Sequence, residues 1–386
     1  MCACVMRRGF IIVQGLLPMM LISVYQYSWN LLMKPLMNSL NVNLPVIQVS
    51  YSLFVLFSTI SQVLGGYIAD SRGPRLIGVI GGALAGLGMI TASMVSNIAQ
   101  FYILWSIGSI GVGFVYGVSI NLGVKWFSGS RGLATGLINM GFGIGASLFN
   151  PAISILISRG EYKFSMVLLG VLMLIVIMPL MATAKYPPTS TKRIRFSEIP
   201  PGFWLILASF SLMGIPLQLA SSSLSVIGEG YGYLIVAAAS SLLPLFSGIG
   251  RPIIGSISDK LGRRRTILAV GLVLTVFTMI LAIRSPIAYI TSTVAIGILG
   301  GSLITLFASL IGDEYGIGSS TFLFGILYNG KFVSALIGSV AFAESVEFIK
   351  VGGSLILESA LTLLSMLPFV LFMRTTSSRV NYLENA

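Results

Sequence analysis

Long apolar runs follow one another along almost the whole chain, separated by short polar or charged turns. A membrane-spanning helix needs about 20 apolar residues to cross a hydrocarbon core of roughly 30 Å. The runs have little polar-face periodicity, which is typical of helices packed in a bundle within lipid. The pattern predicts twelve transmembrane helices, at about 9–34, 47–69, 76–96, 99–124, 133–157, 164–184, 203–228, 231–257, 266–284, 286–311, 320–343 and 350–373.

The composition agrees with an all-α, multi-pass membrane protein: 55% of residues are hydrophobic, 9% are charged, and the mean hydropathy is +0.96. The net charge of +12 comes from basic residues on one side of the membrane. Sixteen of the 23 Lys and Arg residues fall in predicted cytoplasmic segments, five on the opposite side and two within spans. This bias predicts a cell-membrane protein with both termini cytoplasmic. The partner is the lipid bilayer, and no nucleic-acid site is expected because the short loops lack interleaved basic and aromatic residues.

The longest polar segment, "KYPPTSTKRIRFSEIPPGF", separates six predicted spans from the next six. Its prolines and basic residues indicate a cytoplasmic linker. We therefore expect an N-terminal six-helix half at 1–184, a linker at 185–202 and a C-terminal six-helix half at 203–386.

The two halves repeat a loop signal, "GGYIADSRGPRLIG" in the first and "IGSISDKLGRRRTIL" in the second. In each, a glycine stands four residues before an aspartate, and another glycine and basic residues follow. A parallel repeat in a twelve-span protein is typical of transporters. We interpret the repeat as a gating motif made of Gly66, Asp70, Arg72, Gly73 and Arg75 in the first copy, and of Gly255, Asp259, Lys260, Gly262, Arg263 and Arg264 in the second.

These loops resemble the major facilitator superfamily motif G-x-x-x-D-[RK]-x-G-[RK]-[RK]. The second copy matches throughout, whereas the first has Ser71 at a basic position and Pro74 before Arg75. The leading glycines would let a neighbouring helix approach closely. The aspartate would face a helix N-terminus or an arginine and latch the cytoplasmic side shut. The alternative is that these loops only fix the topology.

Three further stretches resemble the oxalate/formate antiporter family over nearly the whole chain: "YQYSWNLLMKPL", "GSIGVGFVYGVSINLGVKWFSGSRGLATGLINMGFGIGAS" and "FSGIGRPIIGSISDKLGR". Related monocarboxylate carriers share part of this pattern. In the antiporter family an arginine in span eight and a lysine in span eleven bind substrate. The matching residues are Arg251 in "GRPIIG" and Lys331 in "FGILYNGKFVSALIG".

The spacing places both cations deep in the membrane. Arg251 lies eight residues before Asp259, or about 12 Å along a helix, and Lys331 lies about 18 Å from a span that begins near Ser319. A cation at that depth costs roughly 2.5–3.5 kcal/mol on insertion scales and marks function by default. The resemblance implies that the two residues hold an anion between them. The alternative is a purely structural pairing with Glu344 or Glu358.

The first half contributes no charge within a span, and its candidates are polar. By resemblance, Tyr27 and Tyr116 would line the cavity opposite the cations, and Gln26 lies beside Tyr27. Trp29 is expected to be an aromatic residue at the membrane interface. In span ten, "GILGGSLITLF" places Leu299 and Leu303 where the resemblance leads us to expect aromatic residues. An apolar wall there predicts that carboxylates such as lactate or pyruvate are handled at least as well as oxalate.

The resulting hypothesis is a monomeric secondary transporter of small organic carboxylate anions that works by alternating access. A proton-coupled lactate or pyruvate symporter stays open, because Lys331 or Glu358 could titrate, as does a non-transporting sensor of the same fold. A cation exporter is disfavoured because the first half has no membrane-embedded carboxylate. The chain has no His and no acidic cluster within a span, so we expect no enzyme activity, metal or cofactor.

Overall fold

The computed structural model describes residues 2–127, 131–187, 199–315 and 317–384. The side chains of 2–8, Asp70, 131–133, 317–322 and 376–384 lie outside the described part. Within these ranges the regular structure is helical, with no strand. Eleven segments are long and apolar enough to cross a membrane, the last of them 53 residues long. Lys350 interrupts that segment with φ 60° and ψ 170°, so it supplies two of the twelve expected spans.

The first eight helices are α1 (Cys2–Ile22), α2 (Val24–Tyr27), α3 (Trp29–Leu40), α4 (Leu44–Arg72), α5 (Pro74–Ala92), α6 (Ile98–Trp126), α7 (Arg131–Ser158) and α8 (Tyr162–Ala182). The next group is α9 (Pro201–Met213), α10 (Ile215–Ile227), α11 (Tyr233–Leu261), α12 (Arg263–Ile280), η2 (Leu281–Ile283) and α13 (Pro286–Tyr315). The chain ends with α14 (Ile317–Tyr328), α15 (Gly330–Ala335), the π-helical turn η3 (Leu336–Ala341), α16 (Phe342–Leu364) and α17 (Met366–Glu384).

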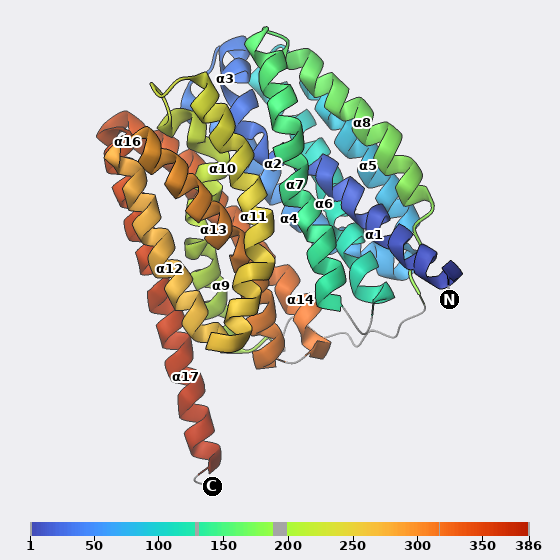
Figure 1. Cartoon of the computed structure of the whole chain (residues 1–386), viewed down its shortest axis with the longest axis vertical. Coiled ribbons are helices and arrows are strands. Elements are labelled where there is room, and N and C mark those ends of the chain that lie inside the picture. The colour runs from blue at the N-terminus through green and yellow to red at the C-terminus, as the bar shows by residue number, and fades with distance from the viewer. Residues whose placement is uncertain (1, 128–130, 188–198, 316, 385–386) are drawn as a thin grey trace.

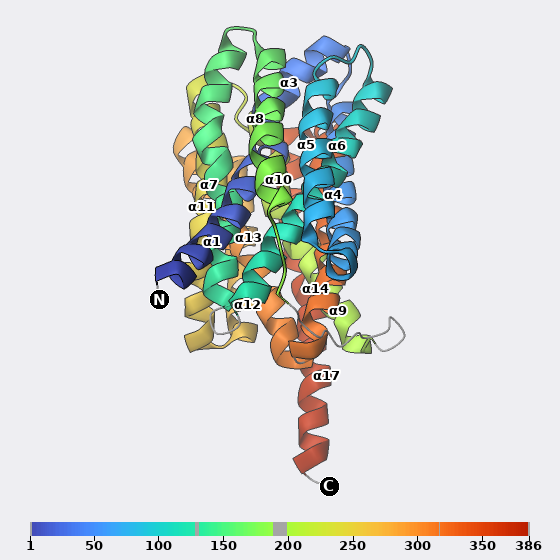
Figure 2. The same cartoon turned by 90° about the vertical axis from the view of Figure 1, so that its right-hand side faces the viewer.

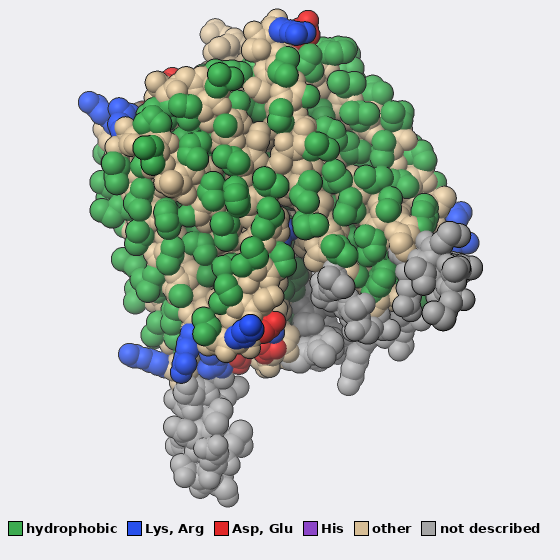
Figure 3. All heavy atoms as spheres, viewed as in Figure 1, with side chains coloured by type: hydrophobic (Ala, Val, Ile, Leu, Met, Phe, Trp, Pro, Cys, Tyr) green, Lys and Arg blue, Asp and Glu red, His purple; other side chains and the backbone are tan. Residues whose placement is uncertain are grey.

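The helices form one elongated bundle, with α1–α8 on one side and α9–α13 on the other (Figure 1). Both termini lie toward the lower end of that view, and α3, α10 and α16 reach the upper end. Figure 2 shows the same long axes from the side. Most of the expected linker, residues 188–198, lies outside the described residues, so the division at 185–202 stays a prediction. Hydrophobic side chains cover the outer surface, and Lys and Arg gather at its lower margin (Figure 3).

Glycines decide which helices pack most closely. The glycines of α6 and α7 were expected to pack their spans tightly, and the structure shows against what. A Cβ added at Gly108 would lie 3.2 Å from Gly88 of α5, and one at Gly143 would lie 2.8 Å from Gly248 of α11. On α11 itself, a Cβ at Gly250 would lie 2.6 Å from the Cα of Ile298 in α13. Because small residues let backbones touch, α11 is held tightly between α7 and α13.

Hydrogen bonds join the two sides of the bundle near its upper end. Side-chain amides donate to backbone carbonyls across the seam, as in the 2.8 Å bond from Asn30 to Ala220 and the 2.7 Å bond from Asn150 to Ser240. Gln48 donates to Ser222 at 3.1 Å in the same way. A buried amide–carbonyl bond contributes a net 0.5–1.5 kcal/mol and costs more than that when one partner is lost. These bonds therefore close the seam on the side opposite the termini.

Candidate functional site

Arg251 is fixed at the centre of the bundle by the packing of α11. It follows Gly250, which is pressed against α13, and its side chain is only 4% exposed. Its guanidinium donates from Nη1 to the backbone carbonyl of Asn139 in α7 at 3.0 Å, across the seam. Its Nε atom is buried without a hydrogen-bond partner. The guanidinium has five N–H donors in a fork that matches a carboxylate, so part of its donor capacity is unused.

Lys331 lies at a break in its span. α14 ends at Tyr328, the chain turns at Asn329, and α15 begins at Gly330. A Cβ at Gly330 would lie 3.0 Å from Leu207 of α9, so close packing fixes the start of α15. The Lys331 side chain is 7% exposed, and its ammonium donates to Oε1 of Gln26 at 2.7 Å.

Gln26 and Tyr27 lie in a similarly interrupted part of span one. The short helix α2 carries both residues between turns at Ser23 and Ser28. The Ser28 hydroxyl donates to Asn150 at 2.6 Å, and Asn150 in turn bridges to α11. Helix interruptions that line a binding site are common in transporters, because the exposed backbone groups find partners there.

Aromatic rings connect the two cations. Tyr116 lies 5.9 Å from Tyr328 between ring centroids, and the Lys331 ammonium lies 5.4 Å from the Tyr328 ring, within the range of a cation–π interaction. Phe142 packs edge-on between Tyr27 and Tyr116. We call Gln26, Tyr27, Tyr116, Asn139, Phe142, Ser247, Arg251, Tyr328 and Lys331 the central cluster.

The phenol groups of the cluster are hydrogen-bonded within it. The Tyr27 hydroxyl lies 3.0 Å from the Ser247 hydroxyl, and Tyr116 donates to Asn139 at 2.9 Å. The structure thus brings together five residues that the sequence singled out: Arg251, Lys331, Gln26, Tyr27 and Tyr116. Their roles in binding stay predictions.

The two cations have no acidic partner among the described side chains. The ion pairs in that part of the chain join other residues. The structural alternative, pairing with Glu344 or Glu358, is therefore not seen: Glu358 is 1% exposed, and its Oε2 atom has no hydrogen-bond partner. The charge of Arg251 acts on the Lys331 ammonium. Two buried like charges without a counterion are costly, and the central cluster is the one place described here where an anion would relieve that cost.

Two expectations from the sequence need correction or restatement. Trp29 is not at the membrane interface: it is 0% exposed and its indole N–H donates to Gln48 at 3.1 Å. The reason is that its helix lies inside the bundle. Leu303 is 1% exposed, whereas Leu299 lines a groove on the outer surface with residues of α11 and α12. The contact of these leucines with a substrate tail remains a prediction that this geometry does not support.

Sequence reasoning missed four members of the cluster. Tyr328 is three residues before Lys331, and Ser247 is four residues before Arg251, so helical periodicity places each on the same face as its cation. That signal was available. Asn139 and Phe142 lie on α7 and reach the cations only across the seam, which no spacing within the sequence reveals.

The charged loop between α11 and α12 pairs within its own side of the bundle. Arg263 pairs with Asp259 at 3.1 Å and also with Asp313 of α13. Arg264 pairs with Glu314, the next residue of α13, at 2.7 Å. These pairs tie α12 to α13, and neither acidic partner on α13 was singled out from the sequence. The Asp70 side chain lies outside the described residues, so the latch stays a prediction.

The glycines of the repeated loops serve two different purposes. Gly73 and Gly262 have φ values of 87° and 88°, which side-chain-bearing residues rarely adopt, so each loop turns on a glycine. By contrast, a Cβ at Gly66 or Gly255 would make ordinary contact at 3.6 Å. The close helix contact expected at Gly255 is found five residues earlier, at Gly250.

Comparison with known proteins places this architecture. The profile of the Major Facilitator Superfamily matches residues 16–339 and 230–383. The chain belongs to the major facilitator superfamily. It is therefore a multi-pass membrane transporter of that superfamily, as the repeated loops indicated. Two solved members share the fold at low identity: the nucleoside transporter NupG (TM-score 0.75, 13% identity, 94% of this chain and 99% of that one) and a bacterial homolog of the human lysosomal transporter Spinster (TM-score 0.74, 15% identity, 95% and 97%).

Curated relatives cover most of this major facilitator chain. An uncharacterized 38 kDa protein of Thermoproteus tenax is 35% identical over 87% of this chain and 88% of its own length. The oxalate:formate antiporter of Oxalobacter formigenes is 30% identical over 86% of this chain and 83% of its own. The apicoplast pyruvate carrier 1 of Toxoplasma gondii is 33% identical over 28% of this chain and 21% of its own. The resemblance to the oxalate/formate antiporters is thereby confirmed.

Proposed function

We propose that this transporter carries small organic carboxylate anions by alternating access, with the central cluster as the binding site. The observation that carries the proposal is the pair of buried cations without a described acidic partner. The similarity to an oxalate:formate antiporter supports it. Arg251 would grip one carboxylate through its unused donors, and Lys331 would supply the second positive charge.

The charge of the cluster also bears on the kind of transport. An empty carrier must bury two like charges when it closes around the site, and a bound anion compensates them. Closing is then favoured when the site is loaded, because the anion binds the closed state more tightly than the open one. This favours exchange of one anion for another over net leak, and we propose antiport for that reason.

The surroundings of the cations favour a compact dianion over a monocarboxylate with an alkyl tail. The residues in contact with Arg251 and Lys331 are a backbone carbonyl, an amide and tyrosine rings, while Leu299 faces an outer groove. An alkyl tail gains from apolar contact at about 0.8 kcal/mol per CH₂, and this setting offers less of it than the span-ten sequence predicted.

The substrate class is tested by competition in proteoliposomes loaded with oxalate. Uptake of labelled oxalate is measured against equal concentrations of unlabelled oxalate, formate, lactate and pyruvate. We expect oxalate to compete at least about tenfold better than lactate, a difference of 1.4 kcal/mol. Equal or better competition by lactate or pyruvate would support the monocarboxylate specificity instead. Absence of counterflow with every acid would favour a sensor.

Proton-coupled symport is a second candidate, and Glu358 is the observation in its favour. This carboxyl group is 1% exposed within α16, and one of its oxygens has no partner. A membrane-embedded carboxyl of this kind is a frequent element of proton relays. Uptake into vesicles without internal substrate, driven by an inward proton gradient, would decide for symport, whereas exchange predicts no such uptake.

We also propose that both termini are cytoplasmic, which has a direct test. Arg159 is exposed at the α7–α8 turn, and Lys260 is exposed at the lower end of α11. In a background with Cys2 and Cys4 replaced by serine, we expect Arg159→Cys to react with an impermeant thiol reagent in intact cells. Lys260→Cys should react only after the membrane is opened. Reaction of both variants in intact cells would contradict the proposed topology.

A further inference from the structure

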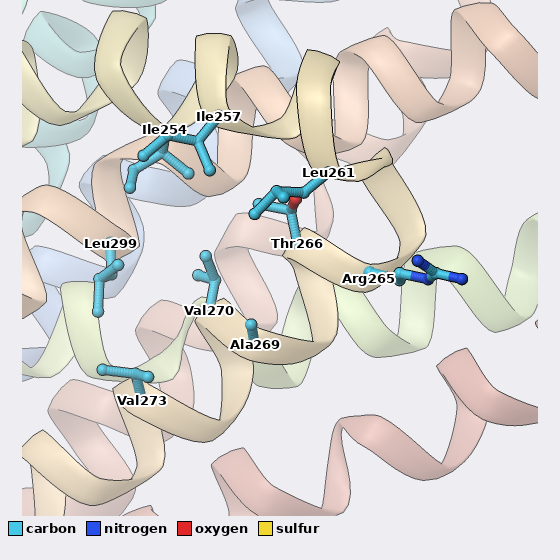
Figure 4. Close-up of a pocket in the computed structure, with 9 residues that line it drawn as sticks. All are labelled: Ile254, Ile257, Leu261, Arg265, Thr266, Ala269, Val270, Val273 and Leu299. Carbon is cyan, nitrogen blue, oxygen red and sulfur yellow. The ribbon is translucent and has the colours of Figure 1, made fainter.

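A groove runs up the outer surface from the arginine-rich lower end, between α11, α12 and α13 (Figure 4). Its volume is about 370 Å³, and apart from one cationic residue its lining is almost entirely apolar. The apolar residues are Ile254, Ile257 and Leu261 of α11, Ala269, Val270 and Val273 of α12, and Leu299 of α13. Thr266 also lines it, but its hydroxyl is occupied by a 3.0 Å bond to the carbonyl of Gly262.

The cation of the groove is Arg265, and it differs from its two neighbours in sequence. Arg263 pairs with Asp259 and Asp313, and Arg264 pairs with Glu314. Arg265 is exposed, lies in the first turn of α12 and has no ion pair among the described residues. The loop thus neutralises two of its three consecutive arginines and leaves the third free beside the groove.

The position of Arg265 relative to the apolar lining matches one kind of ligand. Val273 lies eight residues further along α12, so the groove reaches about 12 Å from the arginine into the membrane. A glycerophospholipid has the same order of parts, with an anionic phosphate at the level of the interface and acyl chains below it. Apolar packing alone gives little preference there, because the chains are already in hydrocarbon. The charge of Arg265 supplies the selectivity for an anionic headgroup.

We propose that this groove binds an anionic phospholipid, with its phosphate at Arg265 and one acyl chain along α12. The site is separate from the central cluster and does not depend on the substrate. Since α11 carries Arg251 and forms one wall of the groove, a seated lipid contacts the helix that bears the central arginine. A zwitterionic lipid of the same chain length fills the groove less well, because its own cation repels Arg265.

The test is native mass spectrometry of the full-length transporter with phosphatidylglycerol or phosphatidylcholine of identical acyl chains. We expect preferential binding of phosphatidylglycerol to the wild type. Arg265→Gln should reduce that preference by about fivefold, the effect of one basic residue at an anionic membrane surface. Ala269→Phe, which places a ring in the groove, should reduce binding of both lipids.

The control is Arg284→Gln, which removes an exposed cation beyond the other end of the same helix and should leave the preference unchanged. Size-exclusion profiles establish that each variant is folded, and Arg265→Gln alone suffices if Ala269→Phe is not. An unchanged preference in Arg265→Gln overturns the proposal. So does competition by inorganic phosphate at equal concentration, because that would show a site for a free anion and not for a lipid.

Discussion

Replacing Arg251 or Lys331 with glutamine should reduce substrate exchange by roughly 30-fold or more, because losing one partner of a buried charge pair costs 2–5 kcal/mol. Each cation is almost fully buried and has no described acidic partner, so a bound carboxylate would be its main source of compensation. Arg251→Lys should rescue little, since lysine cannot form the two parallel hydrogen bonds of a guanidinium with a carboxylate. The measurement is oxalate counterflow in proteoliposomes with matched protein amounts.

Thermal stability separates a binding role from a structural one. Removing an uncompensated buried cation relieves a desolvation cost, so Arg251→Gln and Lys331→Gln should melt at or above the wild-type temperature when empty. They should also lose the stabilisation that substrate gives to the wild type. A structural ion pair predicts the reverse, a lower melting temperature without substrate. Lys163→Gln, which removes an exposed cation at the start of α8, should behave as the wild type in both assays.

Gly250→Ala should destabilise the folded transporter by about 1–3 kcal/mol, the usual effect of overpacking a filled interior. The new methyl group would overlap the backbone of Ile298, and backbone cannot rotate away as a side chain can. Either α11 or α13 must shift, and Arg251 moves with α11. We therefore expect a lower melting temperature together with weaker substrate binding, measured by thermal shift with and without oxalate.

Gly255→Ala is the matched control, since it is the same substitution on the same helix five residues later. Its methyl group would lie 3.6 Å from Thr305, an ordinary contact. We expect its melting temperature to stay close to that of the wild type, although Gly255, and not Gly250, belongs to the sequence motif. Equal destabilisation by both substitutions would show that any added methyl on α11 is harmful and would contradict the packing argument.

The number of spans, their approximate limits and the superfamily were accessible from the sequence. A bilayer imposes one length and one polarity on every spanning helix, so local composition is enough to find them. The two intramembrane cations were accessible for the same reason: a charge within an apolar run is rare and costly. The turn glycines Gly73 and Gly262 also stood out, because a positive φ is a local requirement of the backbone.

The tertiary structure decided which residues face one another, because that depends on how each helix is rotated within the bundle and on which partner it meets. The rotation of α13 places Leu299 in an outer groove, although the sequence pattern had assigned it to the central cavity. The burial of α3 moves Trp29 from the expected interface to a 3.1 Å bond with Gln48. Asn139 contacts Arg251 only because glycines bring α7 and α11 together. Helical periodicity defines faces within one span, but the choice of neighbour for each face is made by packing between helices far apart in the chain.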